Sequence, residues 1–157
     1  LVSQHEALFD RAVFLSPWVC STEKSARMYE RLAGVSAAAL RIGWLVRMQA
    51  KYWSLTPEQT EFMAGYSRNI TKQKYAAWFT NRINLDDLPG YADVRIPMLA
   101  VCGEKEVKEM KYSVAELGRR NAHCKTLMLP GANHDYPMRN PEAITPILLE
   151  FLDKLAA

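Results

Sequence analysis

Pro97-Met98-Leu99-Ala100-Val101-Cys102-Gly103 is a continuous apolar run that ends at a glycine. Such a run is typical of a parallel strand that is buried on both faces. An acidic turn, Glu104-Lys105-Glu106, follows it, and residues 108–121 have the composition of a polar helix. A second apolar run over residues 125–129 then leads into a loop that contains His134. The order of strand, acid, helix, strand and histidine predicts a βαβ unit, and it places the chain in the α/β class.

Two side chains of this unit predict chemistry. Adjacent parallel strands end at the same edge of a sheet, which is where open α/β sheets bind ligands. A carboxylate there can accept the Nδ1 proton of a histidine, fix its tautomer and stabilise the imidazolium that forms when the ring acts as a general base. Glu106 and His134 are therefore candidates for a catalytic pair. The alternative is that Glu106 is a solvated turn residue and His134 an ordinary loop histidine.

The C-terminal part of the chain resembles the α/β-hydrolases. The resemblance is carried by four segments: residues 95–106, residues 129–134, Asn140-Pro141-Glu142 and Phe151-Leu152. In that family an acid follows strand seven in a Gly-x-x-Asp pattern, a histidine follows strand eight, and a final helix covers the sheet. The resemblance puts Glu106 at the acid position and His134 at the histidine position.

The chain departs from the family pattern at two positions of this site. The acid is Glu where Asp is usual, and Asn133 precedes the histidine where Gly often stands. A Glu acid is known in this fold. Glu104, two residues before Glu106, remains a rival for the acid.

The N-terminal residues fit the same resemblance. Residues 1–8 have the character of the tail of a helix, and Ala12-Val13-Phe14-Leu15 is an apolar run that Ser16-Pro17 stops. The resemblance implies that these are the helix after the nucleophile and strand six. The nucleophilic serine and the oxyanion-hole donors of the family would then come from residues upstream of Leu1.

The sequence around Ser36 is similar to that of a nucleophilic serine. Gly34-Val35-Ser36-Ala37-Ala38 nearly spells the family's nucleophile elbow, and Ser36, Glu106 and His134 stand in hydrolase order. An elbow needs a strand before it, whereas residues 23–32 are charged and helical in period. We therefore expect Gly34 to end one helix and Ser36 to begin the next.

Residues 18–93 read as a helical insertion without any alternating strand pattern. One apolar stripe at helical spacing comprises Ala37, Leu40, Trp44, Met48 and Tyr52. Beside it lie three basic residues for which the sequence suggests no acidic partner: Arg41, Arg47 and Lys51. The resemblance implies a cap that lies over the active site and shapes the acyl pocket. The alternatives are a small helical core for the stripe, and a membrane surface, an anionic substrate or only solvent for the basic residues.

Two further helices are expected in the insertion. Thr56 as N-cap, Pro57 and Gln59 form a capping box, and we expect Phe62, Met63 and Tyr66 to be the buried side of that helix. Thr71 starts the next helix, which carries Tyr75, Trp78 and Phe79. Residues 86–90 then break the pattern into a linker.

The last helix is expected after Asn140, which can cap it. Its apolar side comprises Ile147, Leu148, Phe151, Leu152 and Leu155. Pro146 leaves two possibilities, because a proline inside a helix removes a backbone donor. Either the first turn is separate and Thr145 caps the main helix, or the helix is kinked.

Composition limits the classes of partner. The chain is 49% hydrophobic and 24% charged with a net charge of +3, which suits a globular domain and gives no sign of nucleic-acid binding. No apolar run is long enough for stable membrane insertion. The cysteines Cys20, Cys102 and Cys124 are odd in number and have no metal-ligand spacing. This favours a reducing compartment, and we expect a cytoplasmic protein.

The sequence thus predicts part of an α/β-hydrolase fold: three parallel strands with a helical cap insertion and flanking helices. Residues 1–17 and 94–157 would form the C-terminal half of the hydrolase core, and residues 18–93 the cap. The implied function is hydrolysis of an ester or related acyl bond in a small-molecule substrate, with His134 as base and Glu106 as its orienting acid. Neither a metal nor an organic cofactor is expected.

Two other classes remain open. One is a non-catalytic interaction module with the hydrolase fold, and the other is a hydrolase-fold lyase or acyltransferase. The chain alone is expected to be inactive. It is also expected to form a homodimer or to associate with the missing N-terminal half, because strand six would otherwise expose an apolar edge.

Overall fold

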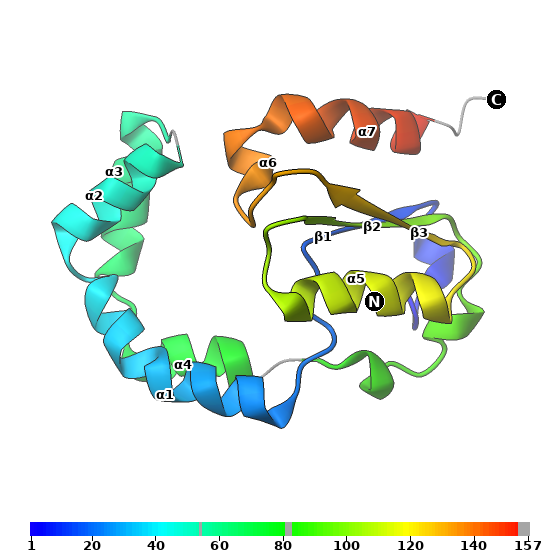
Figure 1. Ribbon diagram of the computed structural model, residues 1–157, viewed down its shortest axis with the longest axis horizontal. Helices are drawn as coiled ribbons and strands as arrows, with labels where there is room; N and C mark the ends of the chain where they lie inside the picture. Colours follow the sequence, from blue (N-terminus) through cyan, green and yellow to red (C-terminus); the bar gives the residue numbers. More distant parts are fainter. Residues whose placement is uncertain (54, 81–82, 154–157) are drawn as a thin grey trace. The chain divides into compact units, whose positions relative to one another are not determined.

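The structure, a computed structural model, describes residues 1–53, 55–80 and 83–153, without the side chains of residues 79 and 80 (Figure 1). It divides into two compact units. The first comprises Leu1–Ser21 and Ile83–Ala157, and the second is Thr22–Arg82. Each unit is described by itself below.

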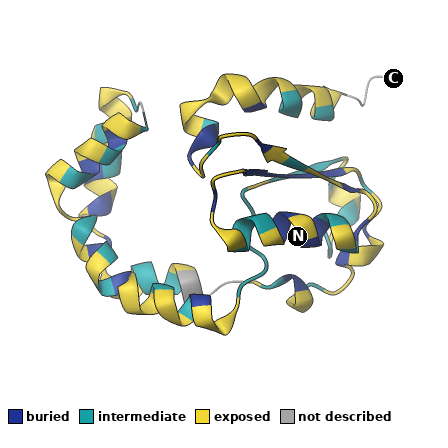
Figure 2. Ribbon diagram, viewed as in Figure 1, coloured by how far each residue is buried: buried dark blue, intermediate teal, exposed yellow. Residues whose placement is uncertain are grey.

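The first unit is built on a sheet of three parallel strands in the order β1-β2-β3. These are β1 (Ala12–Leu15), β2 (Met98–Gly103) and β3 (Cys124–Leu129). In the register, Val13 lies opposite Leu99, which in turn lies opposite Lys125. The predicted fold class is confirmed, because the three apolar runs are parallel neighbours. All six residues of β2 are buried, as expected for a central strand (Figure 2).

Helices cover both faces of this sheet (Figure 1). On one face, α5 (Lys108–Arg120) packs Val114 and Leu117 into a cluster with Met98 and Ala100 of β2. On the other face, α6 (Tyr136–Arg139) and α7 (Pro141–Asp153) contribute to a second cluster, in which Tyr136 and Ile144 pack with Leu99 and Val101 of β2. Because β2 alternates its side chains between the two clusters, it joins three layers into one core.

Helix α7 runs through Pro146 without interruption. Proline lacks the N–H that would donate to the carbonyl of Glu142. Glu142 is exposed, so water can satisfy that carbonyl. Of the two possibilities left by the sequence, a separate first turn is therefore excluded. Leu155, which was expected on the apolar side of this helix, lies outside the described residues.

Residues 83–93, like residues 18–21, belong to the first unit, although they were predicted to belong to the insertion. They contain the short 3₁₀ turns η2 (Leu85–Asp87) and η3 (Tyr91–Asp93), and Leu85 and Tyr91 are buried; a third turn, η1 (Glu6–Leu8), lies near the N-terminus. The Asn121 side chain donates to the backbone oxygen of Tyr91 at 2.7 Å. A segment read as a linker is thus held in place by burial and by a buried amide.

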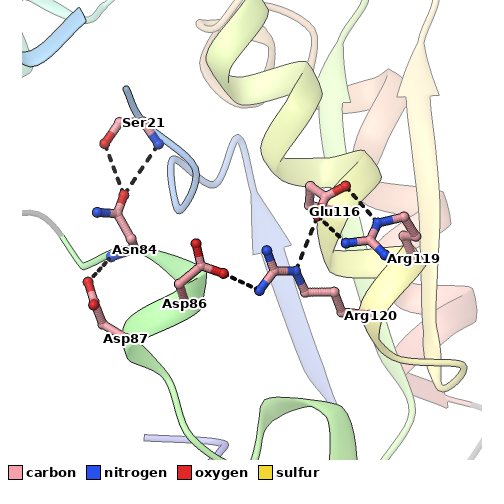
Figure 3. Close-up of polar contacts among 7 residues, drawn as sticks. All are labelled: Ser21, Asn84, Asp86, Asp87, Glu116, Arg119 and Arg120. Carbon is pink, nitrogen blue, oxygen red and sulfur yellow. Dashed lines mark hydrogen bonds and ion pairs between the residues drawn. The ribbon is translucent and has the colours of Figure 1, made fainter. Parts of the chain in front are cut away.

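A network of charged and polar side chains also ties η2 to α5 (Figure 3). Arg120 contacts Asp86 of η2 at 2.5 Å and Glu116 of its own helix at 3.2 Å. Arg119 binds both oxygens of Glu116, at 2.7 and 2.8 Å. These hydrogen bonds lower the pKa of Glu116 from 4.5 to about 2, with Arg119 making the largest contribution.

The second unit consists of four helices within the described residues: α1 (Glu23–Ala39), α2 (Gly43–Tyr52), α3 (Pro57–Ser67) and α4 (Lys72–Thr80). Helix α1 packs on α4, and α2 packs on α3. The capping box at Thr56 is confirmed, because Thr56 and Gln59 bond each other's backbone N–H groups. Thr71 accepts a hydrogen bond from the N–H of Lys74, which confirms the predicted start of α4.

Several expectations for this unit are wrong. Helix α1 does not end at Gly34 but continues through Ser36 to Ala39, because Ala33 and Ala37 on one face are fully buried. Arg47, for which no acidic partner was expected, contacts Glu61 at 3.0 Å.

The buried side of α3 also differs from the prediction. Phe62 and Tyr66 are 76% and 61% exposed, and the buried residues are instead Ala64 and Ser67. Small side chains take the buried positions of α3, while its large side chains remain exposed. The stripe on α2 behaves similarly, since Trp44, Met48 and Tyr52 are each more than half exposed. In α4, Tyr75 and Trp78 form a tilted ring pair, while the Phe79 side chain lies outside the described part.

Candidate functional site

Glu106 lies in the turn after β2, and its side chain is fully buried. One carboxylate oxygen, Oε1, accepts hydrogen bonds from the backbone N–H of Gly103 and from the hydroxyl of Ser16, both at 2.7 Å. The second oxygen, Oε2, lies 3.0 Å from Nδ1 of His134. The acid is therefore held on one oxygen by two donors and presents the other to the histidine.

His134 lies in the loop after β3 and is two-thirds exposed, with 67% of its side chain accessible. A carboxylate can only accept hydrogen bonds, so the contact with Glu106 places the histidine proton on Nδ1. This leaves Nε2 as the basic nitrogen of the ring. An imidazole held in this tautomer by a buried carboxylate, with its other nitrogen available, is the arrangement that a general base requires.

Glu104 takes a different position from Glu106. Its Oε2 accepts a hydrogen bond from the backbone N–H of Gly131 at 2.8 Å. Its own backbone N–H donates to the carbonyl of Leu129 at 2.9 Å. Glu104 therefore braces the loop that carries His134, and of the two acids in this turn the structure brings only Glu106 to the imidazole.

A close backbone approach joins the acid turn to the histidine loop. A Cβ atom at Gly103 would lie 2.3 Å from the carbonyl oxygen of Ala132, which is far inside van der Waals contact. The same oxygen accepts a hydrogen bond from the N–H of Lys105 at 2.9 Å. Only glycine fits at the end of β2 under these conditions. The resulting fixed spacing between the two loops sets the distance between Glu106 and His134.

Sequence reasoning missed Ser16 as a member of this site. It read Ser16-Pro17 only as the end of a strand. The residue lies at the carboxyl end of β1, 90 positions from Glu106 in the chain. The available signal was topological: β1 is parallel to β2, so the residue that follows β1 comes to the same sheet edge as Glu106.

Cys102 lies in β2 and carries a side chain that could act as a nucleophile, but it is fully buried. Burial raises the pKa of its thiol, which disfavours the reactive thiolate. Ser36 lies inside α1, so its backbone is helical and not the strand-to-helix turn of a nucleophile elbow. Neither residue has the setting of a nucleophile.

The second unit has an apolar pocket of about 580 Å³. Its lining comes from the end of α1, from α2 and from α4. The residues are Ser36, Ala39, Leu40, Leu45, Val46, Met48, Gln49, Tyr52 and Tyr75. Its size is in the range of pockets that hold small organic ligands.

The described residues contain no group of three or more His, Cys, Asp or Glu side chains placed to hold a metal ion. No helix among them combines the length and apolarity needed to cross a bilayer.

Solved structures of known proteins share this architecture, whereas no protein-family model and no curated protein matches the chain. The enol-lactonase from Burkholderia xenovorans LB400 is 18% identical and superposes with a TM-score of 0.68 over 98% of this chain. The E-2-(acetamidomethylene)succinate hydrolase is 17% identical, with a TM-score of 0.65 over 97%. A bromoperoxidase from Bacillus anthracis is 12% identical, with a TM-score of 0.65 over 91%.

The chain adopts part of the α/β-hydrolase fold. It spans only 60% of the enol-lactonase, 60% of the succinate hydrolase and 58% of the bromoperoxidase. The hydrolase fold predicted from the sequence is thereby confirmed as a partial fold. At these identities the likeness concerns the fold alone, and the different names of these proteins show that one fold serves several reactions.

Proposed function

We propose that this chain supplies the base and the acid of a serine-type acyl hydrolase, in which His134 activates a serine and Glu106 orients His134. The observation that carries the proposal is the 3.0 Å contact between Nδ1 of His134 and the fully buried carboxylate of Glu106 at the sheet edge. In the reaction, Nε2 would take the serine proton as the hydroxyl attacks an acyl carbon, and later return it to the leaving group.

The nucleophilic serine belongs, in this proposal, to residues that precede Leu1 in a longer protein. The support is twofold. The chain spans 60% of the enol-lactonase that shares its fold, and the serine in it with a nucleophile-like sequence, Ser36, lies within a helix. The oxyanion-hole donors would come from the same preceding residues.

The substrate in this proposal is a small molecule with an ester or related acyl bond. The enol-lactonase and the succinate hydrolase among the structural neighbours support hydrolysis as the reaction class.

The edge of β1 supports a proposal about assembly. Within the described residues, β1 pairs only with β2, so in that part of the chain the backbone groups of alternate residues on its other side face no strand. An apolar hollow of about 490 Å³ lies along this edge and includes Val13, Phe14 and Leu117. We propose that this edge pairs with the preceding part of the longer protein or, in the isolated chain, with a second copy.

The cellular compartment in this proposal is the cytoplasm. The cysteines Cys20, Cys102 and Cys124 are all free thiols, which suits a reducing environment.

The test uses the longer protein, with the residues that precede Leu1 included, and a small activated ester as substrate. His134→Ala is expected to lower kcat by several orders of magnitude, as loss of a triad base does. Glu106→Gln is expected to lower it severely as well.

Two matched variants serve as controls. His123→Ala changes another histidine, in the turn before β3, and Glu104→Gln changes the acid that braces the loop. Both are expected to retain most activity. If Glu104→Gln abolished activity while Glu106→Gln did not, the acid would be misassigned. If neither wild type nor any variant hydrolysed esters, a non-catalytic hydrolase-fold module would replace the proposal.

A further inference from the structure

The two donors that hold Oε1 of Glu106 differ in origin. Gly103 is the last residue of β2 and lies only three residues before the acid in the chain. Ser16 directly follows β1, the neighbouring strand, and its hydroxyl reaches the same oxygen at 2.7 Å. Ser16 therefore connects the Glu106 side chain to the end of a second strand, 90 positions away in the chain.

We propose that Ser16 is a positioning residue that holds Oε1 of Glu106 and thereby aims Oε2 at Nδ1 of His134. The inference rests on the proposed function, because aiming the acid affects catalysis only if His134 is the base. Glu has one more rotatable side-chain bond than Asp, and a longer side chain loses more conformational entropy when it is fixed. A second donor, placed directly after a neighbouring strand, restrains this longer acid in the geometry that His134 needs.

The backbone of Ser16 supports this role. Its φ is 48°, and it is the only residue other than glycine with positive φ in the part of the chain that the structure describes. Glycine adopts this region without strain, whereas other residues persist there only when their surroundings hold them. The N–H of Ser16 is fixed by the carbonyl of Val101 at 2.7 Å. Glycine would adopt this φ with less strain than serine, so we attribute the presence of serine at this position to the hydrogen bond of its hydroxyl.

The acid end of this hydrogen bond is buried. The Glu106 side chain is fully buried, whereas Ser16 is half-buried. A hydrogen bond to a buried carboxylate is stronger than one between exposed groups.

The test measures the tautomer of His134 in this chain and needs no activity. Histidine labelled with ¹⁵N gives long-range proton–nitrogen spectra that distinguish a proton on Nδ1 from one on Nε2. Spectra are recorded well above the usual histidine pKa of about 6.5, so that the rings are neutral. His134 is identified by the signals that disappear in His134→Ala. The wild type is expected to carry its proton on Nδ1.

Two variants remove the hydroxyl in different ways. Ser16→Gly accepts the φ of 48° without strain and should fold, whereas Ser16→Ala retains the Cβ atom and the strain. Both are expected to lower the ratio of Nδ1-protonated to Nε2-protonated His134 by about fivefold or more, because a hydrogen bond to a charged group is lost. Ser21→Gly is the matched control, since the Ser21 hydroxyl bonds Asn84 and not Glu106 (Figure 3). It should leave the ratio unchanged.

Each other result has a definite meaning. An unchanged ratio in Ser16→Gly, or a change in Ser16→Ala alone, would overturn the positioning role, because the hydroxyl would then not matter. Glu106→Ala separates this failure from that of the proposed function. If Glu106→Ala collapses the ratio while Ser16→Gly does not, only the inference about Ser16 fails. If Glu106→Ala has no effect either, the pair of Glu106 and His134 is itself wrong.

Discussion

Gly103→Ala should disturb the spacing between the acid turn and the histidine loop. The added Cβ would lie 2.3 Å from the carbonyl oxygen of Ala132, whereas ordinary contacts begin near 3.4 Å, so the loop must retreat by about 1 Å. The hydrogen bond from Lys105 to the same oxygen would be lost with that movement. Overpacking costs about 1–3 kcal/mol and a lost hydrogen bond about 1 kcal/mol. We expect a total loss of about 3 kcal/mol in local stability.

Hydrogen exchange of the β2 and β3 amides measures this loss, because it reports on the first unit alone. Gly131→Ala is the matched control in the same loop. Its φ is +67° but no atom lies within 4 Å of the added Cβ, so only backbone strain of about 1 kcal/mol is expected. Much lower protection of these amides in Gly103→Ala than in Gly131→Ala would support the reasoning. Protection within about 0.5 kcal/mol of wild type in Gly103→Ala would refute the close approach.

Two further outcomes follow from the first unit. The pKa of Glu116 is lowered from 4.5 to about 2, so its ion pairs stabilise the fold above pH 4.5, and this stabilisation disappears as the pH falls towards 2. Glu116→Gln should lack this part of the pH dependence of acid unfolding. Identical unfolding curves for the variant and the wild type would contradict the network in Figure 3. Light scattering at micromolar concentration should show the isolated chain as a dimer or larger, because the β1 edge is open; a stable monomer that binds no hydrophobic dye would exclude such an edge.

The strands and the pairing of acid and histidine could be predicted because their signals are local and strong. Short apolar runs that end at glycine or proline are typical of buried parallel strands. Once β2 and β3 are parallel neighbours, residues that follow them must share one edge, which brings Glu106 to His134. The capping box at Thr56 was equally local, since it needs only Thr56 and Gln59 at their spacing.

The errors arose where packing overrides local preference. Gly34 indicates a helix end by propensity, yet α1 continues because buried Ala33 and Ala37 hold it in the second unit. Phe62 looks like a core residue by its type, but the buried positions of α3 are taken by Ala64 and Ser67, and Phe62 is exposed. Ser16 was missed because topology places it only at the same sheet edge as Glu106, whereas its positive φ and its hydrogen bond to a residue 90 positions away are visible only in the structure.

The central claim is that this chain carries the base and acid of a serine hydrolase whose nucleophile precedes Leu1. Labelling the longer protein with a serine-directed fluorophosphonate, followed by peptide mapping, tests it most directly. We expect one labelled serine upstream of Leu1, labelling that His134→Ala suppresses by several orders of magnitude, and no labelling of the isolated chain. A label on Ser36, or upstream labelling that does not depend on His134, would contradict the account.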